Sequence, residues 1–242
     1  MLGRTMRWLG RLRGGGPALR REVEAALAQA RAGRPQAAIA AVSGHFPQAL
    51  ELLAEMGGPP ETAWLQLAAR LLFRAGRMRE AAAAIEQALG QAEDAASWNL
   101  VGRVRVWLQD RRADEAFSRA AALDPGHYVR PYRVSRKRFG ALADAALARI
   151  PGPFQERLAN TMIVVDDLPT LDSVLEGEDP DLLGLYEGAT VLEHGLPERI
   201  VLYQRNHENV SGDLGELAEQ VDETMAHEIG HHFGMSEDDL PY

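Results

Sequence analysis

A period near 34 residues in the first half of the sequence is the feature that most restricts the fold. Small or apolar residues recur at matching offsets in residues 62–95 and 94–127. In the first stretch they are Leu65, Ala68, Ala69, Leu72, Gly76, Ala81, Ile85 and Ala88, and in the second Leu100, Val101, Val104, Ala113, Phe117, Ala120 and Pro125. Spacings of three and four residues are typical of amphipathic helices. The sequence therefore predicts helix pairs that stack on their neighbours.

This pattern resembles the tetratricopeptide repeat, in which a small residue lets the two helices of a pair approach closely. A poorer copy begins near Ala18 and continues through Gly33 to Ile39. We predict an all-α helical-repeat region at residues 18–127 that recruits a protein partner on its concave face. A plain alanine-rich helical bundle is the alternative.

Charge is divided unevenly along the chain. Residues 1–160 hold 24 of the 26 Lys and Arg residues, whereas residues 161–242 hold 20 of the 35 Asp and Glu residues. A break of this size indicates two units with different roles. The basic half has no aromatic-rich binding motif, so we do not expect a nucleic-acid partner. Residues 1–17 are expected to form a basic tail, with contact to an acidic membrane surface as the less favoured alternative.

The chain contains no cysteine. Disulfides and thiolate metal ligands are therefore excluded, and any metal must be bound by His, Asp or Glu. No apolar run approaches the roughly 20 residues that span a bilayer. Arginines interrupt the apolar residues near the N-terminus, unlike a secretory signal. These features favour a cytoplasmic protein.

Residues 132–242 differ from the helical half in their residue pattern and predict a small α+β domain. A helical stretch over 135–160 precedes three short β-type segments, at Thr161–Val165, Leu182–Tyr186 and Ile200–Tyr203. The first of these is an apolar run that suits a central strand. The acidic segment from Pro169 to Pro180 is expected to be a loop. A last helix is predicted to begin after Asp213, which forms a capping pair with Glu216, and to run to Phe233, with Gly234 ending it.

The last predicted helix carries the sequence His-Glu-Ile-Gly-His at residues 227–231. His227 and His231 are four residues apart and therefore lie on the same side of a helix, where both imidazoles can reach one zinc ion. Glu228 is turned by about 100° from His227, a position from which it can reach water bound to that ion. The pattern predicts a metal site with His227 and His231 as ligands and Glu228 as catalytic base.

The chain has five further histidines, none of which is required as a ligand. His232 is expected to pack or to cap the helix, because it points toward the apolar stripe. His194 and His207 are expected in or near loops and are alternatives that no spacing requires. His45 and His127 belong to the helical half and are expected to be structural or solvated.

Residues from about 135 to 242 resemble the minimal zincin-like metallopeptidases of bacteria. The resemblance covers RKRFGALADAALARIP, MIVVDDLP, LLGLYEG, LPERIVLYQRN and HEIGHHFGMSEDDL. It implies a small mixed sheet with helices and a third ligand just past Gly234. Metzincin-type spacing favours Glu237, whereas the family's usual aspartate favours Asp238. Two imidazoles and one carboxylate leave a position open for water, as in catalytic zinc sites.

The leading hypothesis is zinc-dependent hydrolysis of a peptide or protein substrate. Glu228 would take a proton from water and deliver it to the leaving amine. The segment Arg199–Arg205 is expected to be a strand along the cleft, to which an extended peptide adds. The alternative is an interaction scaffold, in which the helical repeats act and the metal domain is inactive.

Overall fold

The computed structural model describes residues 17–42, 45–56, 61–158, 161–188 and 198–233. It divides into two compact units. The first unit extends to Pro125 and also includes Leu171–Gly177, and the second comprises the rest from Gly126 onward. The predicted fold class is confirmed, since a helical N-terminal region precedes a small α+β domain. None of the helices in the described ranges is long and apolar enough to cross a membrane.

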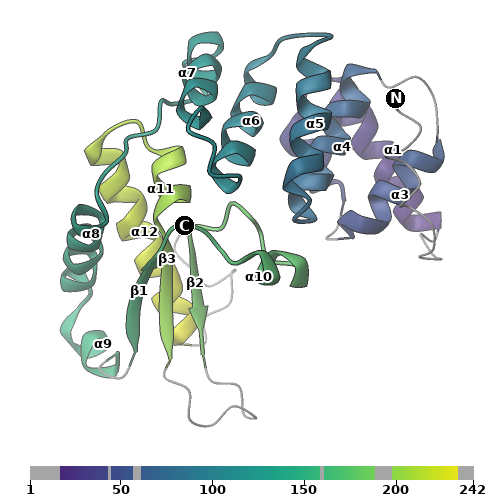
Figure 1. Ribbon diagram of the computed structural model, residues 1–242. Helices are drawn as coiled ribbons and strands as arrows, with labels where there is room; N and C mark the ends of the chain where they lie inside the picture. Colours follow the sequence, from purple (N-terminus) through teal and green to yellow (C-terminus); the bar gives the residue numbers. More distant parts are fainter. Residues whose placement is uncertain (1–16, 43–44, 57–60, 159–160, 189–197, 234–242) are drawn as a thin grey trace. The chain divides into compact units, whose positions relative to one another are not determined.

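Eight helices of the first unit are described. They are α1 (Pro17–Arg31), α2 (Pro35–Ala40), α3 (Phe46–Met56), α4 (Thr62–Arg74), α5 (Met78–Leu89), α6 (Ala95–Trp107), α7 (Ala113–Leu123) and α10 (Leu171–Glu176). α4 packs on α5, α5 on α6 and α6 on α7, so that neighbours in sequence are neighbours in space (Figure 1). α4 and α6 begin 33 residues apart, which agrees with the period of the sequence. Assignment to the tetratricopeptide family stays a prediction.

The turns between paired helices repeat one hydrogen-bonding pattern. At α4–α5 the Gly76 N–H donates to the Phe73 carbonyl and the next N–H donates to the Leu72 carbonyl, and Gly76 has φ +72°. This is the Schellman arrangement, which requires a left-handed residue. The turn between α6 and α7 has the same two bonds but places Gln109 at φ +55°. Gln109 therefore holds a conformation that favours glycine.

The segment Pro169–Pro180, predicted as a loop, contains α10, and that prediction is wrong. Leu171, Val174 and Leu175 have the three- and four-residue spacing of a helical face. All three lie within 3.5 Å of the position that a Cβ on Gly76 would occupy. Because acidic residues occupy the remaining faces, this short apolar pattern was not recognised as a helix.

The second unit contains three strands and four helices in its described part. They are α8 (Arg136–Arg149), α9 (Gly152–Arg157), β1 (Met162–Asp166), β2 (Gly184–Glu187), β3 (Arg199–Tyr203), α11 (Gln204–Val210) and α12 (Leu214–His232). The strand order is β1-β3-β2, with β1 parallel and β2 antiparallel to β3 (Figure 1). α12 packs against β2, β3 and α8 around a core that includes Phe139, Leu202 and Met225.

The central strand is β3 and not β1, contrary to the sequence prediction. Ile200, Val201, Leu202 and Tyr203 are all buried, whereas β1 is half-buried along most of its length. An apolar run indicates burial, but the order of strands depends on pairing between distant segments. Local sequence therefore does not show which of the two apolar runs forms the central strand.

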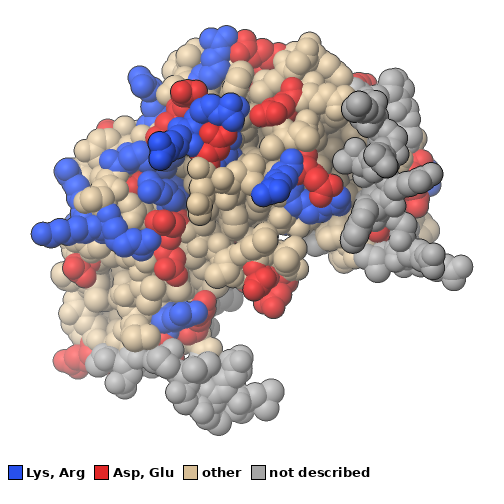
Figure 2. Space-filling model, in the orientation of Figure 1, with Lys and Arg blue, Asp and Glu red and all other residues tan. Residues whose placement is uncertain are grey.

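The change in charge does not fall at the boundary between the units. α8 belongs to the second unit, yet its first turn is basic, with Arg136, Lys137 and Arg138. Figure 2 shows Lys and Arg side chains gathered over this helix, while acidic side chains on that face are scattered. Among the elements after α8, α12 carries the largest share of the acidic residues, with five.

Candidate metal centre and active site

α12 is fixed at its start by the predicted capping pair. Asp213 Oδ1 accepts hydrogen bonds from the N–H groups of Gly215 and Glu216 at 2.7 and 3.0 Å. Glu216 Oε2 in turn accepts from the Gly212 N–H at 2.6 Å. Such reciprocal bonds satisfy N–H groups that a helix start leaves unpaired. The helix ends at His232 with Phe233 as its C-cap, one residue earlier than predicted.

His227 and His231 converge near the end of α12. Their Nε2 atoms are 3.0 Å apart, and their rings are almost perpendicular, with centroids 4.6 Å apart. A tetrahedral zinc ion with Zn–N bonds of about 2.0–2.1 Å separates two nitrogen ligands by roughly 3.3–3.4 Å. A small opening of the pair would therefore admit the ion. Both residues fit the role of zinc ligands.

The third ligand cannot be placed among the described residues. Glu237 and Asp238, the two candidates from the sequence, lie outside them. Within the described ranges, no group of three or more His, Cys, Asp or Glu side chains is arranged to hold a metal ion. The geometry that supports zinc is therefore that of the histidine pair alone.

Glu228 faces the sheet and is buried, with 6% of its surface exposed. Its Oε2 accepts a hydrogen bond of 2.8 Å from the backbone N–H of Tyr186 in β2. The carboxylate is thus oriented by a strand and lies one residue after the first candidate ligand. That placement suits a base acting on water beside the histidine pair.

Gly184 makes this approach of strand and helix feasible. A Cβ at Gly184 would lie 2.6 Å from Thr224 Cγ2 and 3.0 Å from Glu228 Cγ, too close for any side chain. Sequence reasoning did not single out this residue. A glycine inside a short strand often marks a close backbone approach, and that signal was available.

α12 packs against both β2 and β3, but β3 is the middle strand of the sheet, so the expectation that an extended peptide adds to Arg199–Arg205 is wrong. β3 is paired on both sides, and residues from Gln204 onward belong to α11. β2 is a terminal strand of the described sheet, and its Tyr186 N–H points to Glu228 instead of to β3. The edge that an extended peptide could join next to Glu228 is therefore that of β2.

A cavity of about 370 Å³ lies between the residues before β2 and α12. Its walls are Asp179, Asp181, Leu182, Leu183, Gly184, Gln220, Glu223, Thr224, His227 and Glu228. The volume is in the range of small-ligand sites. Because His227 and Glu228 contribute to the wall, a molecule in the cavity would contact the candidate reacting groups.

Residues 158–242 match the zincin-like metallopeptidase family. The match includes β1, β2, β3, α11 and α12, and therefore all the candidate site residues. No curated protein matches the chain. The zincin-like region, as we call residues 158–242, accordingly supports a metal-dependent hydrolase by similarity.

In the zincin-like region His232 packs against Tyr186. Its Nδ1 is 3.2 Å from the Tyr186 hydroxyl and 3.3 Å from Glu198 Oε2. Burial raises the pKa of the Tyr186 hydroxyl, and nearby Glu198 raises it further. Tyr186 thus contacts two residues on one face of α12, Glu228 through its backbone and His232 through its side chain. Sequence reasoning missed Tyr186.

His207 lies in α11 and is fully buried, not in or near a loop as predicted. Its Nδ1 is 3.0 Å from the Tyr203 carbonyl oxygen and its Nε2 is 3.1 Å from Thr224 Oγ1. Burial lowers the pKa of this imidazole to about 4. With both nitrogens engaged, His207 supports the cavity wall at Thr224. His45 and His127 are exposed, and His194 lies outside the described residues.

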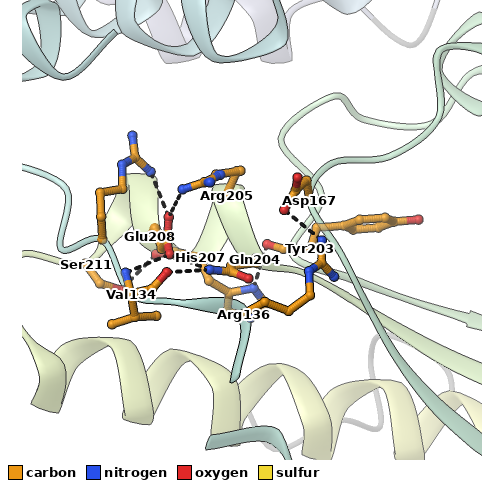
Figure 3. A network of polar contacts seen from close by, with 10 residues as sticks. Val134, Arg136, Asp167, Tyr203, Gln204, Arg205, His207, Glu208 and Ser211 are labelled. Carbon is orange, nitrogen blue, oxygen red and sulfur yellow. Dashed lines mark hydrogen bonds and ion pairs between the residues drawn. The ribbon is translucent and has the colours of Figure 1, made fainter. Parts of the chain in front are cut away.

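α11 holds several segments around the site. Glu208 is fully buried, and its carboxylate accepts from the Val134 N–H at 3.0 Å, from Gln204 at 2.7 Å and from Arg205 at 2.9 Å (Figure 3). Asn206 Nδ2 donates to the carbonyls of Pro180 and Leu182 at 2.9 and 2.8 Å. Asn206 therefore fixes the chain that forms one wall of the cavity. The polar sequence of α11, which directly follows the buried strand β3, was the feature of the sequence that could have identified these residues.

Proposed function

We propose that the zincin-like region is a zinc-dependent peptidase. His227, His231 and an acid past Gly234, Glu237 by spacing or Asp238 by residue type, would hold the ion. The observation that carries this proposal is the pair of Nε2 atoms 3.0 Å apart, with the buried Glu228 carboxylate next to it on the same helix. The family match supports the reaction class.

Glu228 is the proton carrier in this mechanism. A zinc ion held by His227 and His231 would supply Lewis acidity toward the scissile carbonyl and the attacking water. Glu228 accepts the proton of the attacking water and transfers it to the leaving amine. The Tyr186 N–H holds Oε2 at 2.8 Å, so the carboxylate is oriented before substrate arrives. Burial of Glu228 keeps bulk water from competing for that proton.

The substrate would be an extended peptide along the outer edge of β2. On that edge the Tyr186 N–H is bonded to Glu228, so the peptide would pair with the other outward main-chain groups of β2. A peptide added there gains backbone hydrogen bonds and places a carbonyl near Glu228. Side chains of the peptide would then alternate between the cavity and solvent.

Zinc content and hydrolysis test the two roles separately. Glu228→Gln is expected to keep about one zinc per chain and to lose hydrolysis, because the amide cannot accept the proton. His231→Ala is expected to lose the metal. Glu219→Gln, an exposed position on the same helix, is the matched control and should retain both properties. Full hydrolysis by Glu228→Gln would contradict the role of this residue.

The third ligand is resolved by comparing Glu237→Ala with Asp238→Ala in the same elemental analysis. We expect the larger loss of zinc in Glu237→Ala. Equal retention in both variants would place the third ligand elsewhere.

A second role, recruitment of a protein partner by the helical unit, is supported by an apolar groove. The groove has a volume of about 390 Å³ and is lined by Leu50, Leu53, Ala54, Trp64, Leu65, Ala68, Leu72, Arg77, Arg79, Glu80, Ala83, Ala84 and Gln87. Arg77 pairs with Glu80. In the described part of the chain, the exposed Arg79 makes no hydrogen bond or ion pair. An apolar peptide that carries a carboxylate complements this surface.

Selection of displayed peptides on the immobilised protein tests the recruitment role. Apolar sequences with Asp or Glu should be enriched, and Arg79→Glu should shift the enrichment to Lys or Arg. If the variant selects the same peptides, the groove is not the binding surface. Binding with no zinc in the purified protein would favour a scaffold, and a cytoplasmic location is the setting we expect for either role.

A further inference from the structure

His231 lies in the last turn of α12, where the helix itself holds it least. The helix ends at His232, and Gly230, a poor helix former, lies within this turn. Carbonyl groups of the last turn have no partner within the helix, so this end frays more readily than the middle. His227 lies one turn earlier. One zinc ion needs both Nε2 atoms at a fixed separation, so the position of the last turn decides whether the pair can bind it.

The Tyr186 side chain anchors this turn to the sheet. Its hydroxyl lies 3.2 Å from Nδ1 of His232, the residue next to His231, and its ring meets the imidazole edge-on with centroids 5.3 Å apart. The hydroxyl is also hydrogen-bonded to the Glu198 carboxylate, whose Oε2 lies 3.3 Å from the same Nδ1. Side chains from β2, from the residue before β3 and from the end of α12 therefore meet at one point.

Glu198 is itself fixed to the sheet. The Met162 N–H in β1 donates to the carbonyl oxygen of Glu198 at 2.8 Å. The Thr161 hydroxyl donates to Glu198 Oε2 at 3.5 Å. The carboxylate beside His232 is thus held from β1, while the phenol beside it is held from β2.

Gly188 makes room for the Tyr186 hydroxyl. A Cβ at Gly188 would lie 2.6 Å from the hydroxyl oxygen and 2.7 Å from Cε1 of the ring, too close for any side chain. Gly184, two residues before the tyrosine, admits Glu228 in the same way. Glycines on both sides therefore shape the backbone around Tyr186, which indicates that its placement against α12 is specific.

We propose that Tyr186 is a positioning residue for the metal. Together with Glu198, its hydroxyl fixes His232. The neighbouring His231 is thereby held at the distance from His227 that one zinc ion requires. The inference rests on the proposed function, because it takes the histidine pair as zinc ligands. It gives Tyr186 two separate roles, since its N–H orients the base and its hydroxyl fixes the turn that carries a ligand.

Zinc affinity of the Tyr186→Phe protein tests this role. The substitution removes the hydroxyl and leaves the ring and the N–H in place. Affinity is measured by competition with a chromogenic chelator, under conditions where circular dichroism shows each protein to be folded. We expect the zinc dissociation constant to rise about tenfold, because residues that orient metal ligands typically contribute about 10–100-fold to affinity.

Tyr132→Phe is the matched control. Tyr132 is half-buried in the same unit, and its hydroxyl makes no hydrogen bond in the described part of the chain. Its removal should leave the zinc dissociation constant unchanged. A constant for Tyr186→Phe equal to that of the parent protein overturns the proposal, even where the free energy of unfolding falls, since Tyr186 would then only stabilise the fold.

A double-variant cycle shows whether the hydroxyl acts through His232. His232→Phe keeps an aromatic ring at the end of α12 but lacks Nδ1. The protein with both Tyr186→Phe and His232→Phe should bind zinc no more weakly than the weaker single variant. Losses of affinity that multiply would overturn the proposal, because the two groups would then act independently.

Hydrogen exchange of the metal-free protein provides a readout that needs no zinc. Amides of residues 229–232 should exchange faster in Tyr186→Phe than in the parent protein, while those of residues 217–225 exchange at the same rate. Unchanged exchange at residues 229–232 would mean that the hydroxyl does not hold the last turn, and the proposal would be wrong.

Failure of this inference and failure of the proposed function give different results. A parent protein that binds zinc but hydrolyses no peptide refutes the peptidase, while weaker zinc binding by Tyr186→Phe still supports the positioning role. Hydrolysis by the parent protein, with equal zinc affinity in Tyr186→Phe, supports the peptidase and overturns the positioning role. A parent protein that binds no zinc overturns both.

Discussion

Replacing Gly184 by alanine should damage the contact between β2 and α12 on which the candidate site depends. The new Cβ would lie 2.6 Å from Thr224 Cγ2, 3.0 Å from Glu228 Cγ and 3.1 Å from Glu228 Oε1. Carbon atoms in contact are normally 3.5–4.0 Å apart. Strand and helix must therefore separate by several tenths of an ångström, which also strains the bond between Glu228 and the Tyr186 N–H.

Overpacking of this kind costs about 1–3 kcal/mol. We expect the Gly184→Ala protein to lose that much free energy of unfolding in urea titrations followed by circular dichroism. The rate of peptide hydrolysis should fall by more than the loss of folded protein accounts for, because the Glu228 carboxylate moves. Gly140→Ala is the control. Gly140 also belongs to the second unit, in α8, but a Cβ added there meets nothing within 4 Å. That substitution should stabilise α8 by about 0.5–1 kcal/mol.

A second substitution makes the test specific to the clash. Thr224→Ser removes Cγ2 but keeps Oγ1, which His207 contacts at 3.1 Å. In the double variant with Gly184→Ala, part of the lost stability should return, giving a coupling of about 0.5–1.5 kcal/mol. Additive effects of the two changes, or a Gly184→Ala protein as stable as the parent, would refute the proposed packing.

Three further predictions concern the supports of the fold. Gln109→Gly should raise stability by about 0.5–1 kcal/mol in urea titrations, because it relieves a left-handed residue at φ +55°, whereas Gly76→Ala should lower it. Because burial lowers the pKa of His207 from 6.5 to about 4, its contribution is full above pH 6.5 and is lost as the pH falls toward 4. The loss should be about 3 kcal/mol, and His207→Gln should flatten this part of the stability profile. Asn206→Ala should free the carbonyls of Pro180 and Leu182, so that hydrogen exchange at residues 181–183 rises while α8 stays protected.

Local sequence was sufficient for the longer helices and for the spacing of the histidine pair. Periodic apolar positions and the Asp213 cap marked α12, and a separation of four residues placed His227 and His231 on one side of it. These are properties of one helix and need no knowledge of the rest of the fold. The same holds for the turn at Gly76, where a glycine follows the last apolar residue of a helix.

Local sequence patterns could not predict which distant segments pair with one another. The strand next to the site is β2, and its role depends on a register of Gly184 against Leu202 that no nearby residue encodes. The helix at residues 171–176 lies against the turn at Gly76, nearly a hundred residues earlier, and no neighbouring residue encodes that approach. Burial of β3 on both sides likewise follows from its place in the sheet.

The His-Glu-Ile-Gly-His sequence becomes a site only through the strand that it packs against. Glu228 and His232 are four residues apart and occupy the face of α12 adjacent to that of His227 and His231. Tyr186 contacts this second face twice, through its N–H to Glu228 and its hydroxyl to His232. The helix therefore presents the candidate metal ligands on one face and contacts the strand that orients the Glu228 carboxylate with the other. Because Gly184 allows that contact and Asn206 fixes the chain leading into it, the geometry of the motif depends on residues outside the motif.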